Sequence, residues 1–165
     1  MTDFIIIGNA NGAMYKNVFP LFKDGKVRFG YNGPNRDMYF NLPEEQRETI
    51  VKEKREGSGW KNVNGVVCGR LANACWFTTC SVEKEPLVLS KTYTPEDYPK
   101  YDNYDAINVD RVEDIPYDYD GVMGVPVSFL AKCGGGFVIE DKLNSPVIGG
   151  GQRIYKRVIV KKNLK

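Results

Sequence analysis

The first 32 residues constrain the fold most, because they combine an expected strand, a helix and a second strand. Residues 3–9 (DFIIIGN) are apolar at successive positions, which is typical of a strand buried on both faces of a parallel sheet. Residues 11–25 carry apolar side chains three and four positions apart, so we expect a helix that ends or kinks near Pro20. Residues 26–32 alternate between apolar and polar side chains, as a second strand does. This order predicts an α/β fold.

The rest of the chain predicts one charged helix and several short strands. Residues 43–57 begin with a proline and two glutamates and end at a glycine, the pattern of a short helix with a solvated surface. Strands are expected over residues 65–71, 74–79, 86–93, 136–140 and 154–160. The first two of these strands are close enough in sequence to pair. The glycine triplets at 134–136 and 149–151 lack the spacing of phosphate-binding motifs, which favours a flexible loop and a tight turn.

The composition excludes several kinds of chemistry. A chain of 165 residues, 42% hydrophobic, has the size of one domain spanning residues 1–165. It contains no histidine, which excludes an imidazole base, a histidine zinc ligand and a Ser-His-Asp triad within this chain. The four cysteines lack the C-x2-C spacing of a zinc site and favour reduced thiols. With neither a signal-peptide pattern nor a membrane-length apolar run, we expect a cytoplasmic protein without membrane contact.

The charges are distributed unevenly along the chain. The acidic segment (residues 96–120) has nine acidic and two basic residues, a net charge of −7, so the other residues sum to +9. It also holds five of the ten tyrosines, and it lacks the spacing of a calcium loop, so we expect a long surface loop that binds no metal. The basic segment (residues 152–165) has six basic residues and no acidic one. Two interpretations of the basic segment remain open: a phosphate-contacting surface, or a solvated edge strand protected by lysines.

Four stretches, residues 4–31, 74–79, 98–130 and 154–162, resemble the EcoRI-type adenine-specific DNA methyltransferases. The most specific is YPKYDNYDAINVDRVEDIPYDYDGVMGVPVSFL (98–130). The resemblance covers about two-thirds of the chain and only the carboxyl-terminal half of the family. It implies methyl transfer from S-adenosylmethionine to the exocyclic amine of an adenine flipped out of duplex DNA. It also implies part of a doubly wound, Rossmann-like sheet, to which this sequence adds a mixed β insertion and the long acidic loop.

The catalytic and cofactor-binding motifs of the family are not found in this sequence. In the family, a glycine-rich cofactor loop and an Asn-Pro-Pro-Phe loop precede the region that matches Phe4. The nearest local patterns, at residues 32–35 and 41–44, lack the double proline and the stacking aromatic residue. We therefore expect no catalytic residue, no metal and no bound cofactor in this chain alone, although the family uses S-adenosylmethionine.

Three functions follow from the resemblance. The first is the DNA-binding part of a split or truncated methyltransferase. The second is a non-catalytic remnant, with a mobile element as its suggested source, that binds or inhibits another nucleic-acid-handling protein. A self-sufficient methyltransferase is the third. For the first function, the expected phosphate contacts are Arg28, Lys156, Arg157, Lys161 and Lys162, and the expected base-side contacts are Trp76, Tyr101, Asn103, Tyr104 and Asn108.

Half of a doubly wound sheet exposes an apolar edge. We therefore expect a partner to cover that edge. The candidates are a companion methyltransferase chain, a second copy of this chain, or an unrelated target protein, in addition to double-stranded DNA.

Overall fold

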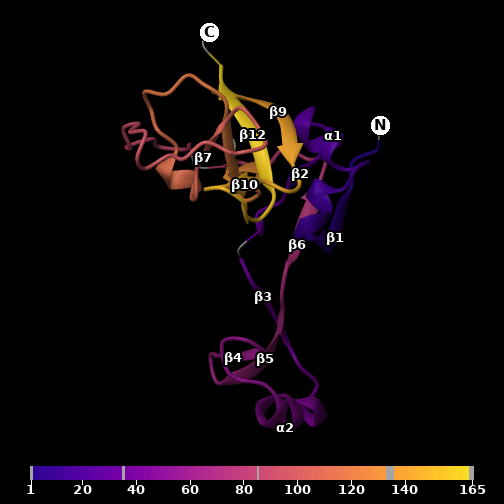
Figure 1. Ribbon diagram of the computed structural model, residues 1–165. Helices are drawn as coiled ribbons and strands as arrows, with labels where there is room; N and C mark the ends of the chain where they lie inside the picture. The colour runs from indigo at the N-terminus through magenta and orange to yellow at the C-terminus, as the bar shows by residue number, and fades with distance from the viewer. Residues whose placement is uncertain (1, 35, 85, 133–135, 164–165) are drawn as a thin grey trace.

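The computed structural model describes residues 2–34, 36–84, 86–132 and 136–163. It contains several small sheets and few helices, a mixed α/β arrangement. A main body carries both chain ends, and a smaller lobe formed by β3, α2, β4 and β5 extends away from it (Figure 1).

The first sheet of the main body is built from the start of the chain and one later strand. Its strands, in spatial order, are β1 (Ile5–Asn9), β6 (Ala74–Thr78) and β2 (Arg28–Phe29). β6 lies between β1 and β2 and runs antiparallel to both. The expected strand–helix–strand order is therefore correct, but the expected parallel sheet buried on both faces is wrong at β1. This strand lies at the sheet edge, where Ile5, Ile6 and Ile7 are 63%, 52% and 50% exposed.

The helix expected over residues 11–25 is divided in two. The 3-10 helix η1 (Ala10–Met14) and the helix α1 (Phe19–Lys23) are separated by a short turn. Pro20 occupies the first turn of α1, where a missing N–H costs no hydrogen bond, so it begins this helix and does not end it.

The smaller lobe consists of an antiparallel sheet and a solvated helix. Its elements are β3 (Met38–Asn41), α2 (Glu44–Glu53), β4 (Trp60–Val63) and β5 (Val66–Leu71), with the strands in the order β3-β5-β4. None of the residues of α2 is buried, which confirms the expected surface helix. Asn64 and Gly65 form the β4–β5 turn with positive φ angles of 52° and 84°, the backbone that a two-residue hairpin requires. The expected pairing of 65–71 with 74–79 is wrong, because β5 and β6 belong to different sheets.

The second sheet of the main body contains the carboxyl-terminal strand. In spatial order its strands are β7 (Ile107–Asn108), β8 (Met123–Pro126), β12 (Arg157–Lys162) and β9 (Phe137–Leu143). β7 and β8 are parallel, and the other pairs are antiparallel. β12 lies inside the sheet with residues 157–160 buried, so the interpretation of the basic segment as an edge strand is wrong.

Short elements complete this part of the main body. The 3-10 helix η2 (Val112–Asp114) lies within the acidic segment, and α3 (Phe129–Lys132) follows β8. The strands β10 (Val147–Ile148) and β11 (Gln152–Arg153) form a hairpin. Its turn at residues 149–151 has three positive φ angles, which confirms the expected tight turn and explains why glycine is needed there. Of the other glycine triplet, residues 134 and 135 lie outside the described residues.

One hydrophobic cluster joins the two sheets of the main body. On the first sheet, the Phe29 ring lies 4.8 Å from Phe22 and 5.3 Å from Phe77 between ring centroids. The same cluster includes Ile107 and Val158 of the second sheet. The strand expected over residues 86–93 is not formed; this segment has an isolated β-bridge between Lys91 and Pro116. Its Leu87 and Leu89 pack against the hydrophobic cluster. None of the helices formed by the described residues is long and apolar enough to span a membrane.

Three cysteines are described, and all three are free thiols; Cys133 lies outside the described residues. Burial raises the pKa of the Cys75 thiol from 9.0 to about 11. The unfolded chain loses this proton near pH 9, whereas the folded protein keeps it until about pH 11. We therefore expect the free energy of unfolding to fall by about 3 kcal/mol across this window. Urea titrations at stepped pH test this, and a Cys75→Ala variant should lose less stability over the same window.

Candidate nucleic-acid interface

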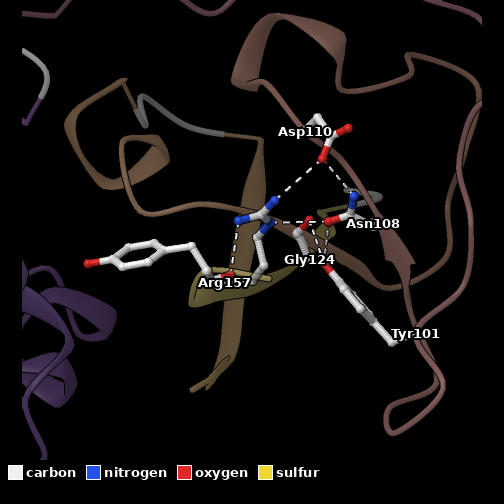
Figure 2. Close-up of polar contacts among 6 residues, drawn as sticks. Tyr101, Asn108, Asp110, Gly124 and Arg157 are labelled. Atoms are coloured by element: carbon white, nitrogen blue, oxygen red, sulfur yellow. Dashed lines mark hydrogen bonds and ion pairs between the residues drawn. The ribbon is translucent and has the colours of Figure 1, made fainter. Parts of the chain in front are cut away.

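Three of the expected DNA-contacting residues meet in a buried polar network (Figure 2). Asn108 on β7 is at its centre: its Oδ1 accepts hydrogen bonds from Arg157 Nε at 3.1 Å and from the Tyr101 hydroxyl at 2.9 Å. Asn108 Nδ2 donates to Asp110 Oδ1 at 2.8 Å. Arg157 and Tyr101 donate to the amide oxygen, and Asp110 accepts from the amide nitrogen. These partners allow only one orientation of the Asn108 amide.

The network ties together segments that are far apart in the sequence. The Tyr101 hydroxyl lies 3.1 Å from the carbonyl oxygen of Gly124 on β8, and Arg157 on β12 donates to the Tyr155 carbonyl at 3.0 Å. An Arg157–Asp110 ion pair at 3.4 Å closes it at the surface, where the Asp110 side chain is 80% exposed. The network therefore anchors the acidic segment to the basic segment.

The side chains at the centre of this network are buried and hydrogen-bonded to one another. Burial raises the pKa of Tyr101 far above its ordinary value, so the phenol stays protonated at neutral pH. Tyr101, Asn108 and Arg157 are all less than 9% exposed. Their hydrogen-bonding groups are directed at one another, and a contact with DNA at these three positions stays a prediction.

The other expected base-side residues lie at the surface. Asn103 donates to the Ser145 carbonyl at 2.9 Å and accepts from the Val147 amide at 3.0 Å, so its amide holds the chain before β10. The neighbouring Tyr104 is exposed. Trp76 is half-buried on β6, in the other sheet, and lines a hollow of about 340 Å³. Trp76 is therefore not brought together with Asn103 and Tyr104, which are adjacent in the acidic segment.

The expected phosphate contacts are also divided between surfaces. On the carboxyl-terminal side, Lys161 is exposed, Lys156 is half-buried, and Lys162 Nζ donates to the Tyr117 carbonyl of the acidic segment. Arg28 lies apart on β2, where it donates to the carbonyls of Gly25 and Cys80.

The acidic segment is not simply a surface loop. Its Tyr98, Ile107 and Ile115 are buried in the core, while most of its carboxylates face solvent. Because β7 lies in the same sheet as β12, the acidic and basic segments are neighbours, joined by the Arg157–Asp110 pair. Among the described residues, no cluster of three acidic or thiol side chains is placed to hold a metal ion.

Two cationic residues that line a cleft are not among the phosphate contacts expected from the sequence. Lys23 on α1 and Lys84, which follows β6, line one cleft together with Arg28. Lys23 and Lys84 are separated by some sixty residues, so no local motif joins them. Sequence reasoning also missed Asp110 as a partner of Asn108. The signal is its position two residues after Asn108, which places both side chains on the same side of an extended chain.

Comparison with known proteins identifies the family. A family model described as "Adenine-specific methyltransferase EcoRI" matches residues 1–137. The chain belongs to this family. Its members are S-adenosylmethionine-dependent methyltransferases, and the match confirms the resemblance drawn from residues 4–31 and 98–130.

Three curated relatives are all named type II methyltransferases. M.EcoRI of Escherichia coli is 41% identical over 133 residues, which cover 78% of this chain and 39% of the relative. M.MgeORF184P of Mycoplasma genitalium is 29% identical over 97% of this chain and 57% of its own length. M.MpnI of Mycoplasma pneumoniae is 30% identical over 78% of this chain and 40% of its own length. The chain thus spans 39–57% of the length of these relatives. No solved structure shows a significant match.

The glycine-rich turn at residues 149–151 does not have the form of a cofactor loop. This turn is followed by a strand, and the amides of Gly150 and Gly151 already donate to Asp102 at 2.9 and 3.1 Å.

Proposed function

We propose that this chain is the non-catalytic, DNA-contacting part of a split or truncated adenine-specific DNA methyltransferase. In this proposal, a companion polypeptide supplies the cofactor loop and the Asn-Pro-Pro-Phe loop. The observation that carries it is the match of residues 1–137 to the family of adenine-specific methyltransferases.

The outer face of the first sheet has the features of a surface that a companion polypeptide would cover. Ile7 pairs with Trp76 and Ile5 with Thr78, so these side chains share the face opposite to the buried Phe77. Tyr31, 80% exposed, and Ile5 border the same hollow of about 340 Å³. An apolar face next to a free strand edge is the kind of surface that proteins cover with another element. We define Ile5, Ile7, Tyr31 and Trp76 as the companion surface.

The DNA contacts belong to the accessible members of the expected set. Lys156 and Lys161 on one side and Arg28 on another offer charge to phosphates. Asn103 and Tyr104 are the base-side candidates that stay accessible when a companion covers Trp76. Tyr101, Asn108, Arg157 and Lys162 act by holding the sheet beneath them.

The proposal predicts that activity returns when the missing part is supplied. The probe is the portion of M.EcoRI outside the region matched by this chain, mixed with the chain, tritiated S-adenosylmethionine and duplex DNA. We expect methyl transfer to adenine from the mixture and none from either part. An Ile5→Asp/Ile7→Asp variant should lower complex formation at least about tenfold, since it places two charges in an apolar contact. Val88→Asp, at a 79% exposed position elsewhere, is the matched control.

The same experiment contains the result that rejects a companion role. A mixture that forms no complex and transfers no methyl group contradicts it, as does equal complex formation by the double variant and the control. Duplex binding is measured alongside. Four phosphate contacts give a slope near −3.6 in a plot of log affinity against log salt.

A second function, binding to another nucleic-acid-handling protein, is supported by the acidic segment. Its carboxylates face solvent together with Tyr117, which is 56% exposed, and tyrosine is favoured at protein interfaces. An acidic surface directly beside β12 repels DNA phosphates from the basic segment. If the chain does not bind duplex DNA at about 50 mM salt, the second function replaces the first.

A further inference from the structure

Among the described residues, one edge of β1 has no neighbouring strand: β6 pairs with the other edge, and β1 lies at the outside of the first sheet (Figure 1). The three isoleucines of β1 are at least half exposed, and no charged residue lies within Ile5–Asn9. Exposed sheet edges in natural proteins are usually short or carry charged residues, which prevents pairing with another chain. The opposite edge of this sheet follows that rule, since β2 has two residues and one of them is Arg28. The edge of β1 has neither protection.

The backbone hydrogen bonds to the chain around β6 show which groups of β1 face the free edge. The carbonyl of Phe4 accepts from the Thr79 amide at 3.3 Å, and the Ala10 amide donates to the Asn73 carbonyl at 2.7 Å. The pairing of β1 with β6 runs between these two bonds without a shift of register. Because hydrogen-bonded and non-hydrogen-bonded residues alternate along an antiparallel strand, the even-numbered residues of β1 bond toward β6. The N–H and C=O groups of Ile5 and Ile7 therefore point outward, where another strand can reach them.

This edge is complementary to a second copy of itself. In an antiparallel pair centred on Ile6, Ile5 lies opposite Ile7 of the second copy, and their outward N–H and C=O groups exchange hydrogen bonds in both directions. Ile6 then faces Ile6 of the second copy, so isoleucine meets isoleucine on both faces of the joined sheet. Asp3, the nearest charged residue along the chain, lies opposite Asn9 of the second copy, so like charges do not meet. A centre at Ile7 would set Ile5 opposite Asn9 and lose these apolar pairs.

We propose that, in the absence of a companion polypeptide, a second copy of this chain pairs with β1 about a twofold axis at Ile6 and joins the two first sheets into one. The pair is closed, because both copies use the same edge and leave only the short, charged β2 edge at each end. Self-pairing goes beyond the companion role and does not rest on it, although a companion that covers β1 has to displace the second copy. The test uses the chain alone, so either proposal can fail without the other.

Size-exclusion chromatography with light scattering over a dilution series tests self-pairing. At the concentrated end we expect a mass near twice the 18.6 kDa of one chain. Ile7→Pro removes an outward N–H from each copy while leaving the bonds to β6 and an apolar side chain, so it should weaken association about tenfold or more. Ile6→Lys sets like charges opposite each other at the axis and should have a similar effect. Val88→Lys adds the same charge at a 79% exposed position elsewhere and should associate as the unmodified chain does.

Disulfide trapping tests the register and does not depend on a variant that weakens the fold. Opposite residues of a non-hydrogen-bonded antiparallel pair have Cα atoms about 4.5 Å apart, within reach of a disulfide. With oxidised glutathione as the oxidant, Ile6→Cys should give a covalent dimer, whereas Ile5→Cys, which faces Ile7 of the second copy, should not.

The unmodified chain gives the background from the native thiols, and thermal unfolding shows which variants are folded. The proposal is wrong if the unmodified chain keeps the mass of one copy throughout the dilution series. It is also wrong if the folded Ile7→Pro and Ile6→Lys variants associate as the unmodified chain does, or if Ile5→Cys and Ile6→Cys crosslink equally.

Discussion

Replacing Gly124 by alanine is expected to destabilise the protein by about 3 kcal/mol. A Cβ added at Gly124 lies 2.2 Å from the Tyr101 hydroxyl oxygen and 2.6 Å from its Cε2, far inside contact distance. The ring is buried and its hydroxyl group is shared between Asn108 and Gly124, so it has no space to move into. Displacing it breaks the hydrogen bond to Asn108 and separates the acidic segment from β8.

Urea unfolding measures this effect, and Gly12→Ala is the matched control. A Cβ at Gly12 meets its nearest atoms at 3.8 and 3.9 Å, an ordinary contact, so we expect a change within about 0.5 kcal/mol. In a Tyr101→Ala background the added methyl group has space, and Gly124→Ala should then cost much less than in the unmodified chain. Equal effects in the two backgrounds would show that the contact with Tyr101 is not the cause.

Replacing Asn108 by leucine is expected to cost a similar amount, about 3 kcal/mol. Leucine has a similar size, but it removes the acceptor of Arg157 Nε and of the Tyr101 hydroxyl. The guanidinium of Arg157 stays buried in the sheet beside an apolar group, and a buried charge that loses a partner is strongly destabilising.

Asp110→Asn is the control for this variant, because it changes the same network at its exposed end. The Asp110 side chain is 80% exposed and 3.4 Å from Arg157, so water screens the pair and its loss should cost less than about 1 kcal/mol. Denaturant titration of both variants at neutral pH gives the comparison. If Asp110→Asn is as damaging as Asn108→Leu, the stability of the network lies in its surface ion pair and not in the buried amide.

Local features of the fold were predictable where neighbouring residues decide them. The charged composition of residues 43–57 predicts a helix without a buried face, and α2 is such a helix. The tight turn at residues 149–151 likewise follows from three consecutive glycines. In these cases, the conformational preferences of residues next to one another are sufficient.

Pairing between strands was not predictable, because it depends on residues far away in the chain. Residues 5–7 have the composition of a central strand, but β6 reaches only one edge of β1 and leaves the other edge exposed. Residues 65–71 and 74–79 are neighbours in sequence and lie in different sheets. The preference of a segment for a strand does not say which strand it will pair with.

The candidate site shows the same division between features set by neighbouring residues and features set by distant ones. Residue type and resemblance select Tyr101, Asn108 and Arg157, but charge and aromaticity alone do not distinguish a DNA contact from a buried anchor. The cleft formed by Lys23, Arg28 and Lys84 has no local signal, since its residues come from α1, β2 and the chain after β6.

The sequence by itself determined the family, the absence of histidine chemistry and the local form of several elements, because these depend on residue identity and on near neighbours. Only the tertiary structure decided that the basic segment contributes an internal strand, that the acidic segment lies beside it, and that the isoleucines of β1 face solvent. Burial and partnership are properties of contacts between distant segments, and those contacts exist only once the chain has folded.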